Sequence, residues 1–124
     1  MKEADRWFSK KVRYVDAVGD HGHWYNRCCT CGKEYLTKKL QAGHYWGRAN
    51  MATRYNLWNV HPQCVGCNIF KEGNKPEYTL YLIRAYGVDI LKTLESLKNC
   101  SVKLTEKDFE LIIKEAKQFC KKYE

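Results

Sequence analysis

Two pairs of cysteines have the spacing of metal ligands. Cys28 and Cys31 are separated by two residues, and Cys64 and Cys67 repeat that spacing. Two intervening residues let one tight turn direct both sulfurs at a single ion, and four thiolates at about 2.3 Å suit tetrahedral Zn²⁺. These four residues are therefore predicted to form one structural zinc site, with Cys29 as an alternative to Cys28.

Three further polar side chains surround the cysteine pairs. His44 and Asn59 lie in the long segment between the pairs, and Asn68 directly follows Cys67. A strand pair, a zinc site and a helix across the strands would bring these side chains toward one cleft. Each has an ordinary structural role when considered singly. Their joint placement favours a catalytic site.

The elements that position these residues can be read from the hydrophobic pattern. Residues 2–18 have a helical pattern, which the glycine-rich segment 19–23 ends. Residues 33–36 and 40–46 are typical of two short strands, with 37–39 as the turn region. The second strand carries the histidine, and the loop that follows leads to the second cysteine pair.

The second half of the chain is predicted to be helical. A short helix is expected over residues 68–72, and Asn74 is expected to cap a helix that Gly87 ends. Two more apolar stripes follow, the last after Thr105, where Asp108 completes a weak capping box.

Composition limits the function classes. The chain has 124 residues, enough for one domain with a modest core, and its formal charge is +8. Residues 1–54 carry 11 Lys and Arg against 5 Asp and Glu, whereas residues 55–124 carry 11 against 9. This basic excess favours a phosphate-rich partner, although a solvated basic surface has the same composition.

The cysteine count and the apolar runs suggest a location. Seven cysteines with two metal-spaced pairs favour a reducing compartment over a disulfide framework. The N-terminus lacks the apolar core of a signal peptide, and no run approaches the roughly 18 apolar residues that span a bilayer. We therefore expect a cytoplasmic protein without a membrane partner.

The motifs resemble the ββα-metal, or HNH, nuclease motif. Members with two C-x-x-C pairs share a pattern close to D-H…N-L-x-P-L-C-x-x-C-N-x-x-K. The matching positions here are Gly43-His44, NVHPQC at residues 59–64, Cys67-Asn68 and Lys71.

Over about residues 7–97 the chain is also similar to the lambdoid-phage NinG (Rap) recombination endonucleases, through RCCTCGK, QAGHY and NVHPQCVGCN in order. The resemblance implies an α+β fold in a single domain, residues 1–124. An N-terminal helix and loop (1–24) would precede a zinc-stapled HNH-like core (25–74) and C-terminal helices (75–124).

The resemblance also implies roles for individual residues. His44 would be the general base that activates water, and Asn59 would brace the loop facing it. Asn68 would bind a catalytic Mg²⁺ or Mn²⁺. Gly43 occupies a position where many HNH nucleases have an acidic or histidine ligand. The replacement ligand is expected to be His61, with Glu72 and Asn74 as the other candidates.

The function implied is a metal-dependent DNA endonuclease acting on branched recombination intermediates in a bacterial or phage-infected cell. Arg48, Arg54 and Lys71 would contact DNA phosphates. A homodimer would suit junction cleavage. Two alternatives share the cysteine motif: a zinc-stapled nucleic-acid-binding module without catalysis, and an electron carrier with iron in the four thiolates.

Overall fold

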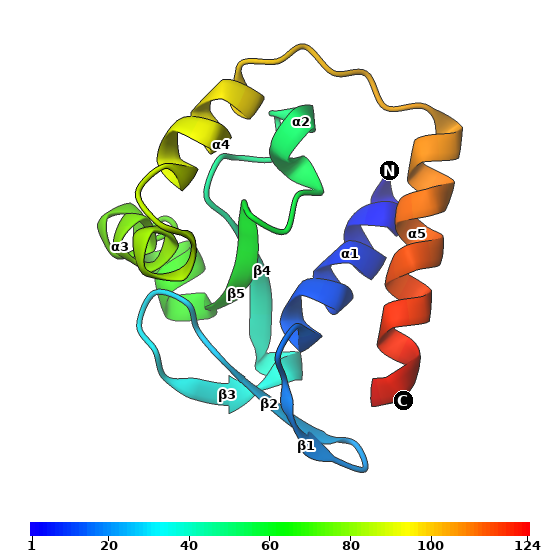
Figure 1. The fold of residues 1–124 in the computed structure, drawn as a ribbon. Helices are drawn as coiled ribbons and strands as arrows, with labels where there is room; N and C mark the ends of the chain where they lie inside the picture. Colours follow the sequence, from blue (N-terminus) through cyan, green and yellow to red (C-terminus); the bar gives the residue numbers. More distant parts are fainter.

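Five strands form two small antiparallel sheets: the pair formed by the last two strands lies between helices, and the three-stranded sheet of the first three strands lies at one end of the molecule (Figure 1). The computed structural model describes all residues, 1–124. The helices are α1 (Lys2–Tyr14), α2 (Met51–Arg54), α3 (Lys75–Tyr86), α4 (Ile90–Lys98) and α5 (Glu106–Cys120). The strands are β1 (Val18–Asp20), β2 (His23–Arg27), β3 (Glu34–Leu36), β4 (Leu40–His44) and β5 (Val60–Cys64). No helix is both long and apolar enough to cross a lipid bilayer.

The β4–β5 pair lies at the centre, with α3 and α4 on one side and α1 and α5 on the other (Figure 1). His44 pairs with Val60, and Gly43 pairs with His61. Successive residues on a strand point to opposite faces, whereas paired residues share a face. His44 and His61 therefore point to opposite sides of this two-stranded sheet.

Apolar side chains pack on both sides of the strand pair. On one side α1 contributes Phe8 and Val12, four residues apart, which pack with Val60 of β5 and Ile112 of α5. On the other side, α3 and α4 form a cluster with Cys29; its members are Tyr78, Leu82, Ile90 and Leu94. The three buried zinc-type cysteines lie in a third cluster with Leu40.

The helical predictions in the second half are largely confirmed. The helix α3 ends at Gly87, whose φ of 91° is a left-handed conformation that glycine adopts readily. Thr105 and Asp108 form the predicted capping box of α5. Asn74 does not cap α3 through its side chain, which instead donates to Cys67 Sγ at 3.6 Å.

The strand predictions in the first half are partly wrong. The first helix ends at Tyr14, and residues 18–27 form the β1–β2 hairpin, which Gly22 turns at a φ of 85°. The predicted strand at residues 33–36 pairs with β2 and not with β4. The partner of β4 is β5, for which no strand was predicted; Pro62 interrupts this segment and no polar alternation marks it.

Candidate active site and metal centre

The four predicted cysteines converge at one point. Their sulfur atoms all lie within 4.8 Å of one another, and Cys31 Sγ is 3.9 Å from Cys64 Sγ. A tetrahedral site with Zn–S bonds of about 2.3 Å has edges of about 3.8 Å. The cluster could therefore hold a metal such as zinc. Cys29 is not a member, because its thiol packs in the cluster on the α3 side, where burial raises its pKa.

Hydrogen-bond donors surround several of the sulfurs, and at Cys28 they favour the thiolate. Burial opposes ionisation of Cys28, but the hydroxyl of Thr30, with Oγ1 3.2 Å from the sulfur, and nearby backbone groups lower its pKa to about 6. The backbone N–H of Cys67 donates to Cys64 Sγ at 3.4 Å. Such donors orient and stabilise anionic ligands around a cation. The Asn74 side chain is one of these donors, because its amide nitrogen bonds to the Cys67 sulfur. It therefore supports the cysteine cluster and is not positioned as the replacement ligand of a catalytic ion.

A cleft of about 590 Å³ adjoins the cysteine cluster. His44 lines it from the end of β4, and Asn68 and Glu72 line it from the turn after the last cysteine. Asp5 of α1 and Arg48 complete its charged lining. The predicted meeting of an imidazole and a carboxamide in one cleft is therefore present.

His44 is held so that one ring nitrogen is free. Its Nε2 lies 3.0 Å from the carbonyl oxygen of Arg54. A carbonyl only accepts, so Nε2 carries the proton and Nδ1 keeps its lone pair. Burial, chiefly, lowers the pKa of His44 below 6.5, although the nearby carbonyls of Arg54 and Ala42 partly oppose this shift. The ring is therefore a neutral proton acceptor at neutral pH.

Asp5 holds the arginine that anchors His44. Its carboxylate accepts from Arg54 Nε at 3.0 Å and Nη2 at 2.6 Å, and from the Tyr55 hydroxyl at 2.8 Å. Burial raises the pKa of Asp5, but these hydrogen bonds outweigh it and lower the pKa overall. Arg54 Nη1 donates to the carbonyl of Arg48 at 2.8 Å. The structure therefore corrects the prediction for Arg54: its guanidinium is committed to protein partners and is not free for a phosphate.

Asn59 lies behind the cleft and is fully buried. Its Oδ1 accepts from the backbone N–H of Trp46 at 2.9 Å, and its Nδ2 donates to the carbonyls of Trp46 at 3.0 Å and Thr53 at 3.2 Å. These bonds hold the loop between His44 and α2. The last residue of α2 is Arg54, whose carbonyl anchors the His44 ring.

Asn68 has one end of its amide fixed. It lies in a π-helical turn, Gly66–Phe70, and its Nδ2 donates to Gln41 Oε1 at 2.8 Å. The amide oxygen is left for another partner. π-helical turns occur often at functional sites, because they place successive side chains differently from an α-helix.

The prediction of His61 as the replacement ligand is wrong. Its ring lies on the opposite face of the sheet from His44. The Tyr78 hydroxyl donates to the Gly43 carbonyl at 2.6 Å, so His61 Nδ1 donates to Tyr78 at 3.0 Å and Nε2 accepts from Tyr86 at 2.8 Å. Burial lowers the pKa of His61 to about 4. Both nitrogens are satisfied, so no lone pair is available to an ion.

The glycine at position 43 has a packing explanation. A Cβ there would collide with the side-chain amide of Gln63, which is fully buried. Gln63 Nε2 donates to the carbonyl of Gly73 at 2.9 Å and to the Thr30 hydroxyl at 3.2 Å. The amide thus occupies the space beside Gly43 and joins β5 to both cysteine turns.

Two of the predicted phosphate contacts remain exposed. Arg48 lines the cleft with 61% of its side chain exposed, and Lys71 lies exposed after the π-helical turn. Sequence reasoning missed Asp5 and Gln41, which hold Arg54 and Asn68 in place. No local signal identifies them, because each acts on a residue at least 27 positions away.

Comparison with known proteins places the chain in a phage family. A family model described as "Bacteriophage Lambda NinG protein" matches residues 1–124. Protein ninG of Escherichia phage lambda is 37% identical over 100 residues, which cover 80% of this chain and 48% of that protein. Protein ninG of Salmonella phage P22 is 36% identical over 97 residues, which cover 77% of this chain and 47% of that protein.

The chain spans about half the length of the curated relatives it matches. No solved structure matches it. The match of the family model over the full length shows that this chain belongs to the NinG family.

Proposed function

We propose that this chain is a metal-dependent DNA endonuclease of the HNH type that cleaves branched recombination intermediates such as Holliday junctions or D-loops. The observation that carries the proposal is the shared cleft of His44 and Asn68, in which His44 keeps a free Nδ1. The branched substrate rests on the resemblance to recombination endonucleases.

The residues of the cleft have complementary roles in this reaction. His44 Nδ1 accepts a proton from the water that attacks the phosphodiester. The Asn68 amide oxygen and the Glu72 carboxylate, which takes the place predicted for His61, would provide oxygen ligands for a divalent cation. A bound Mg²⁺ or Mn²⁺ would stabilise charge on the phosphate and on the departing 3′ oxygen, which gives 5′-phosphate and 3′-hydroxyl ends.

The charge of the cleft supports a cation in this reaction. Two carboxylates, Asp5 and Glu72, line it, and Asp5 is already neutralised by Arg54. Glu72 would repel an incoming phosphate unless a cation lay between them. The cysteine cluster, with Zn²⁺ as the proposed ion, fixes the turn that carries Asn68 and Glu72 without entering the chemistry.

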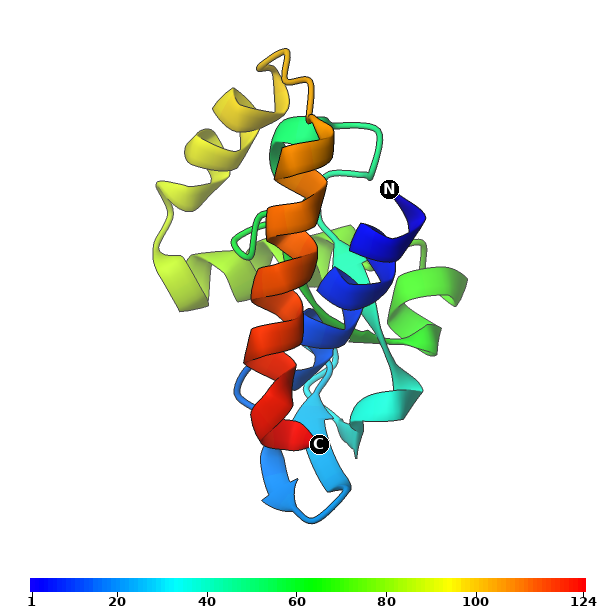
Figure 2. The same cartoon turned by 90° about the vertical axis from the view of Figure 1, so that its right-hand side faces the viewer.

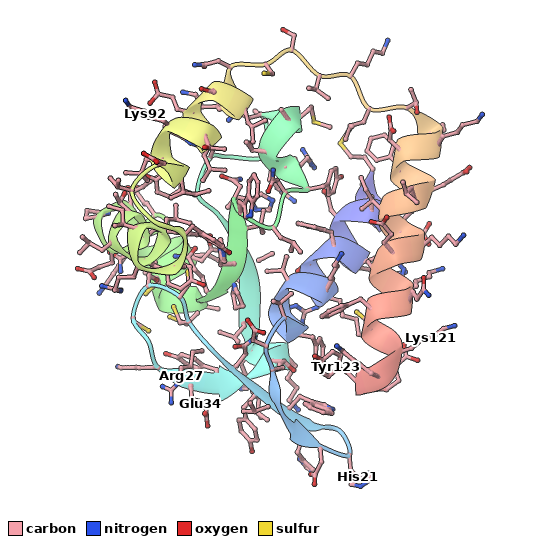
Figure 3. All side chains as sticks on the ribbon, viewed as in Figure 1. His21, Arg27, Glu34, Lys92, Lys121 and Tyr123 are labelled. Carbon is pink, nitrogen blue, oxygen red and sulfur yellow. The ribbon has the colours of Figure 1, made fainter.

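A nicking assay tests the proposal. Wild type and His44→Ala are compared on four-way, flap and linear DNA with Mg²⁺ or Mn²⁺. We expect His44→Ala to cleave at least about 100-fold more slowly, because a general base is lost. His21→Ala is the matched control, because His21 is exposed at the tip of the β1–β2 hairpin (Figure 3). Unchanged cleavage by His44→Ala refutes the assignment.

The second candidate function is a zinc-stapled DNA-binding module without catalysis, which the charge of +8 favours equally. Binding of branched DNA by wild type without cleavage under any divalent metal selects this alternative. A colourless protein with one zinc per chain excludes the iron-containing electron carrier.

A further inference from the structure

The turn that carries Asn68 also exposes an apolar surface. Phe70 has 81% of its surface exposed, more than any other large hydrophobic residue of the chain, and Ile69 has 54%. Val65, one turn earlier, is 38% exposed. Single exposed hydrophobic residues are common, but three on one short turn form a contiguous feature. We call Val65, Ile69 and Phe70 the apolar knuckle.

The apolar knuckle is held rigidly by the bonds beneath it. The N–H of Lys71 donates to the Gly66 carbonyl, and the N–H of Gly73 donates to the Cys67 carbonyl, both at 2.9 Å. Cys67 belongs to the cysteine cluster, and Gln63 Nε2 donates a hydrogen bond to the carbonyl of Gly73. These bonds fix the backbone of the turn from which the Phe70 ring extends into solvent.

The apolar knuckle lies on the same turn of the chain as two residues of the proposed cleavage site, although none of its three side chains lines the cleft itself. Asn68 and Glu72 line the cleft on either side of Phe70 in the chain. Lys71, which directly follows the ring, is exposed and positively charged. The ring and the cation therefore lie on the turn that also carries two side chains of the cleft, within reach of a DNA substrate whose scissile phosphate enters it. The net charge of +8 favours DNA, and not a protein with few acidic residues, as the partner that contacts the apolar knuckle.

We propose that the apolar knuckle stacks on the base pair exposed at a branch point and selects branched DNA over linear duplex. The faces of interior base pairs in linear duplex are covered by their neighbours. Where a branch is unstacked, a terminal base-pair face is open to an aromatic or aliphatic side chain. This inference deepens the proposed function, because it supplies the residues that would recognise the branch.

Binding measured without cleavage tests the proposal. Affinities of wild type, Phe70→Ala and Phe70→Trp are determined for a four-way junction and for a linear duplex of matched sequence, with Ca²⁺ as the only added divalent ion. We expect Phe70→Ala to bind the junction about 10-fold more weakly, the size of one lost base–aromatic stack. Its duplex affinity should remain within about two-fold, and Phe70→Trp should restore the preference.

A fluorescent base gives a second readout. With 2-aminopurine at the branch point, wild type should change its fluorescence on binding and Phe70→Ala should not. Leu111→Ala is the control, because Leu111 is an exposed apolar residue on α5, 54% accessible. Equal junction-to-duplex ratios in wild type and Phe70→Ala, or the same fluorescence change in both, overturn the proposal.

These outcomes are separate from the failure of the endonuclease proposal. A protein that cleaves nothing with Mg²⁺ or Mn²⁺ can still show a junction preference that depends on Phe70. A protein that cleaves branched DNA through His44 but whose selectivity is unaffected by Phe70→Ala keeps the endonuclease function and loses the apolar knuckle as its branch sensor.

Discussion

At the scale of single residues, His44 sets the pH dependence of the proposed reaction. Burial, as the largest cause, lowers its pKa below 6.5. The neutral ring is the base, so the cleavage rate should rise as pH increases through this lowered pKa and stay constant above it. Single-turnover rates from about pH 4.5 to 8, with circular dichroism as a check on folding, measure the midpoint. A midpoint above about 6.5 contradicts the assignment.

His61 makes the stability of the fold sensitive to acid. Below about pH 6.5 the unfolded chain binds a proton at His61, whereas the folded chain accepts it only near a pKa of about 4. The free energy of unfolding should therefore fall as pH falls through this window, by about 3 kcal/mol, and level off below it. Urea unfolding of His61→Gln, whose amide can bond both tyrosines, should lack this part of the slope. Equal slopes in the two proteins count against the prediction.

Gly43 and Gln63 should be energetically coupled. Gly43→Ala forces the buried Gln63 amide to move and to give up its bonds to Gly73 and Thr30. We expect a loss of about 1–3 kcal/mol in the free energy of unfolding. Gln63→Ala makes room for the added methyl, so the double variant should lose less than the sum of the single variants. Simple additivity in urea unfolding would show that the two side chains do not compete for space.

The success of sequence reasoning at this scale depended on the range of the interactions. The cysteines were predictable because two residues between the members of each pair are typical of metal ligands, whereas His44 and Asn68 were predicted from their placement around these pairs and from the resemblance to HNH nucleases. His61 was mispredicted because its direction depends on the β4–β5 register, and Arg54 because its partner Asp5 lies 49 residues away. Neither the register nor that partner leaves a local pattern.

At the scale of elements, the cysteine cluster connects segments that have little core of their own. Cys28 and Cys31 follow β2, Cys64 ends β5, and Cys67 lies in the π-helical turn. We expect a chelator, or Cys64→Ser, to remove the metal and to unfold the β4–β5 region, because structural zinc contributes about as much free energy as a small domain has in total. Thermal unfolding with and without added Zn²⁺ measures this. Cys100→Ser, at an exposed cysteine outside the cluster, is the control; an equal effect of both substitutions would argue against a structural metal.

Elements with signals in their own sequence were predicted, and the strand whose pairing depends on distant residues was not. The helices α3, α4 and α5 have apolar stripes and end signals within their own sequence, and they were predicted nearly in full. The strand β5 is buried throughout and contains Pro62, so it has neither alternation nor an uninterrupted β-branched run. Its pairing with β4 depends on contacts distant in sequence, with the cysteine cluster and with the helices that cover both faces.

At the scale of the whole molecule, the C-terminal helix supports the cleft from behind. The helix α5 packs along α1 (Figure 2), and its Ile112 contacts the cluster of Phe8 and Val12. The helix α1 carries Asp5, which holds Arg54, whose carbonyl orients His44. The C-terminal end is also fixed to the first half of the chain, because Tyr123 (Figure 3) packs against the rings of Tyr14 and Trp24. The position of the His44 ring thus depends on helices at both ends of the sequence.

The placement of charge over the molecule gives a final prediction, for DNA affinity as a function of salt. The slope of log K against log salt reports the number of phosphates that the protein neutralises, at about 0.9 for each in duplex DNA. Arg48→Gln and Lys71→Gln should each reduce that slope by about 1, because both cations are exposed beside the cleft. Lys92→Gln, on the exposed side of α4 (Figure 3), should leave it unchanged. Arg54→Gln should also leave the slope unchanged while it lowers stability, since its charge already pairs with Asp5. A slope reduced equally by all four substitutions would mean that DNA binds the basic surface at large and not at this cleft.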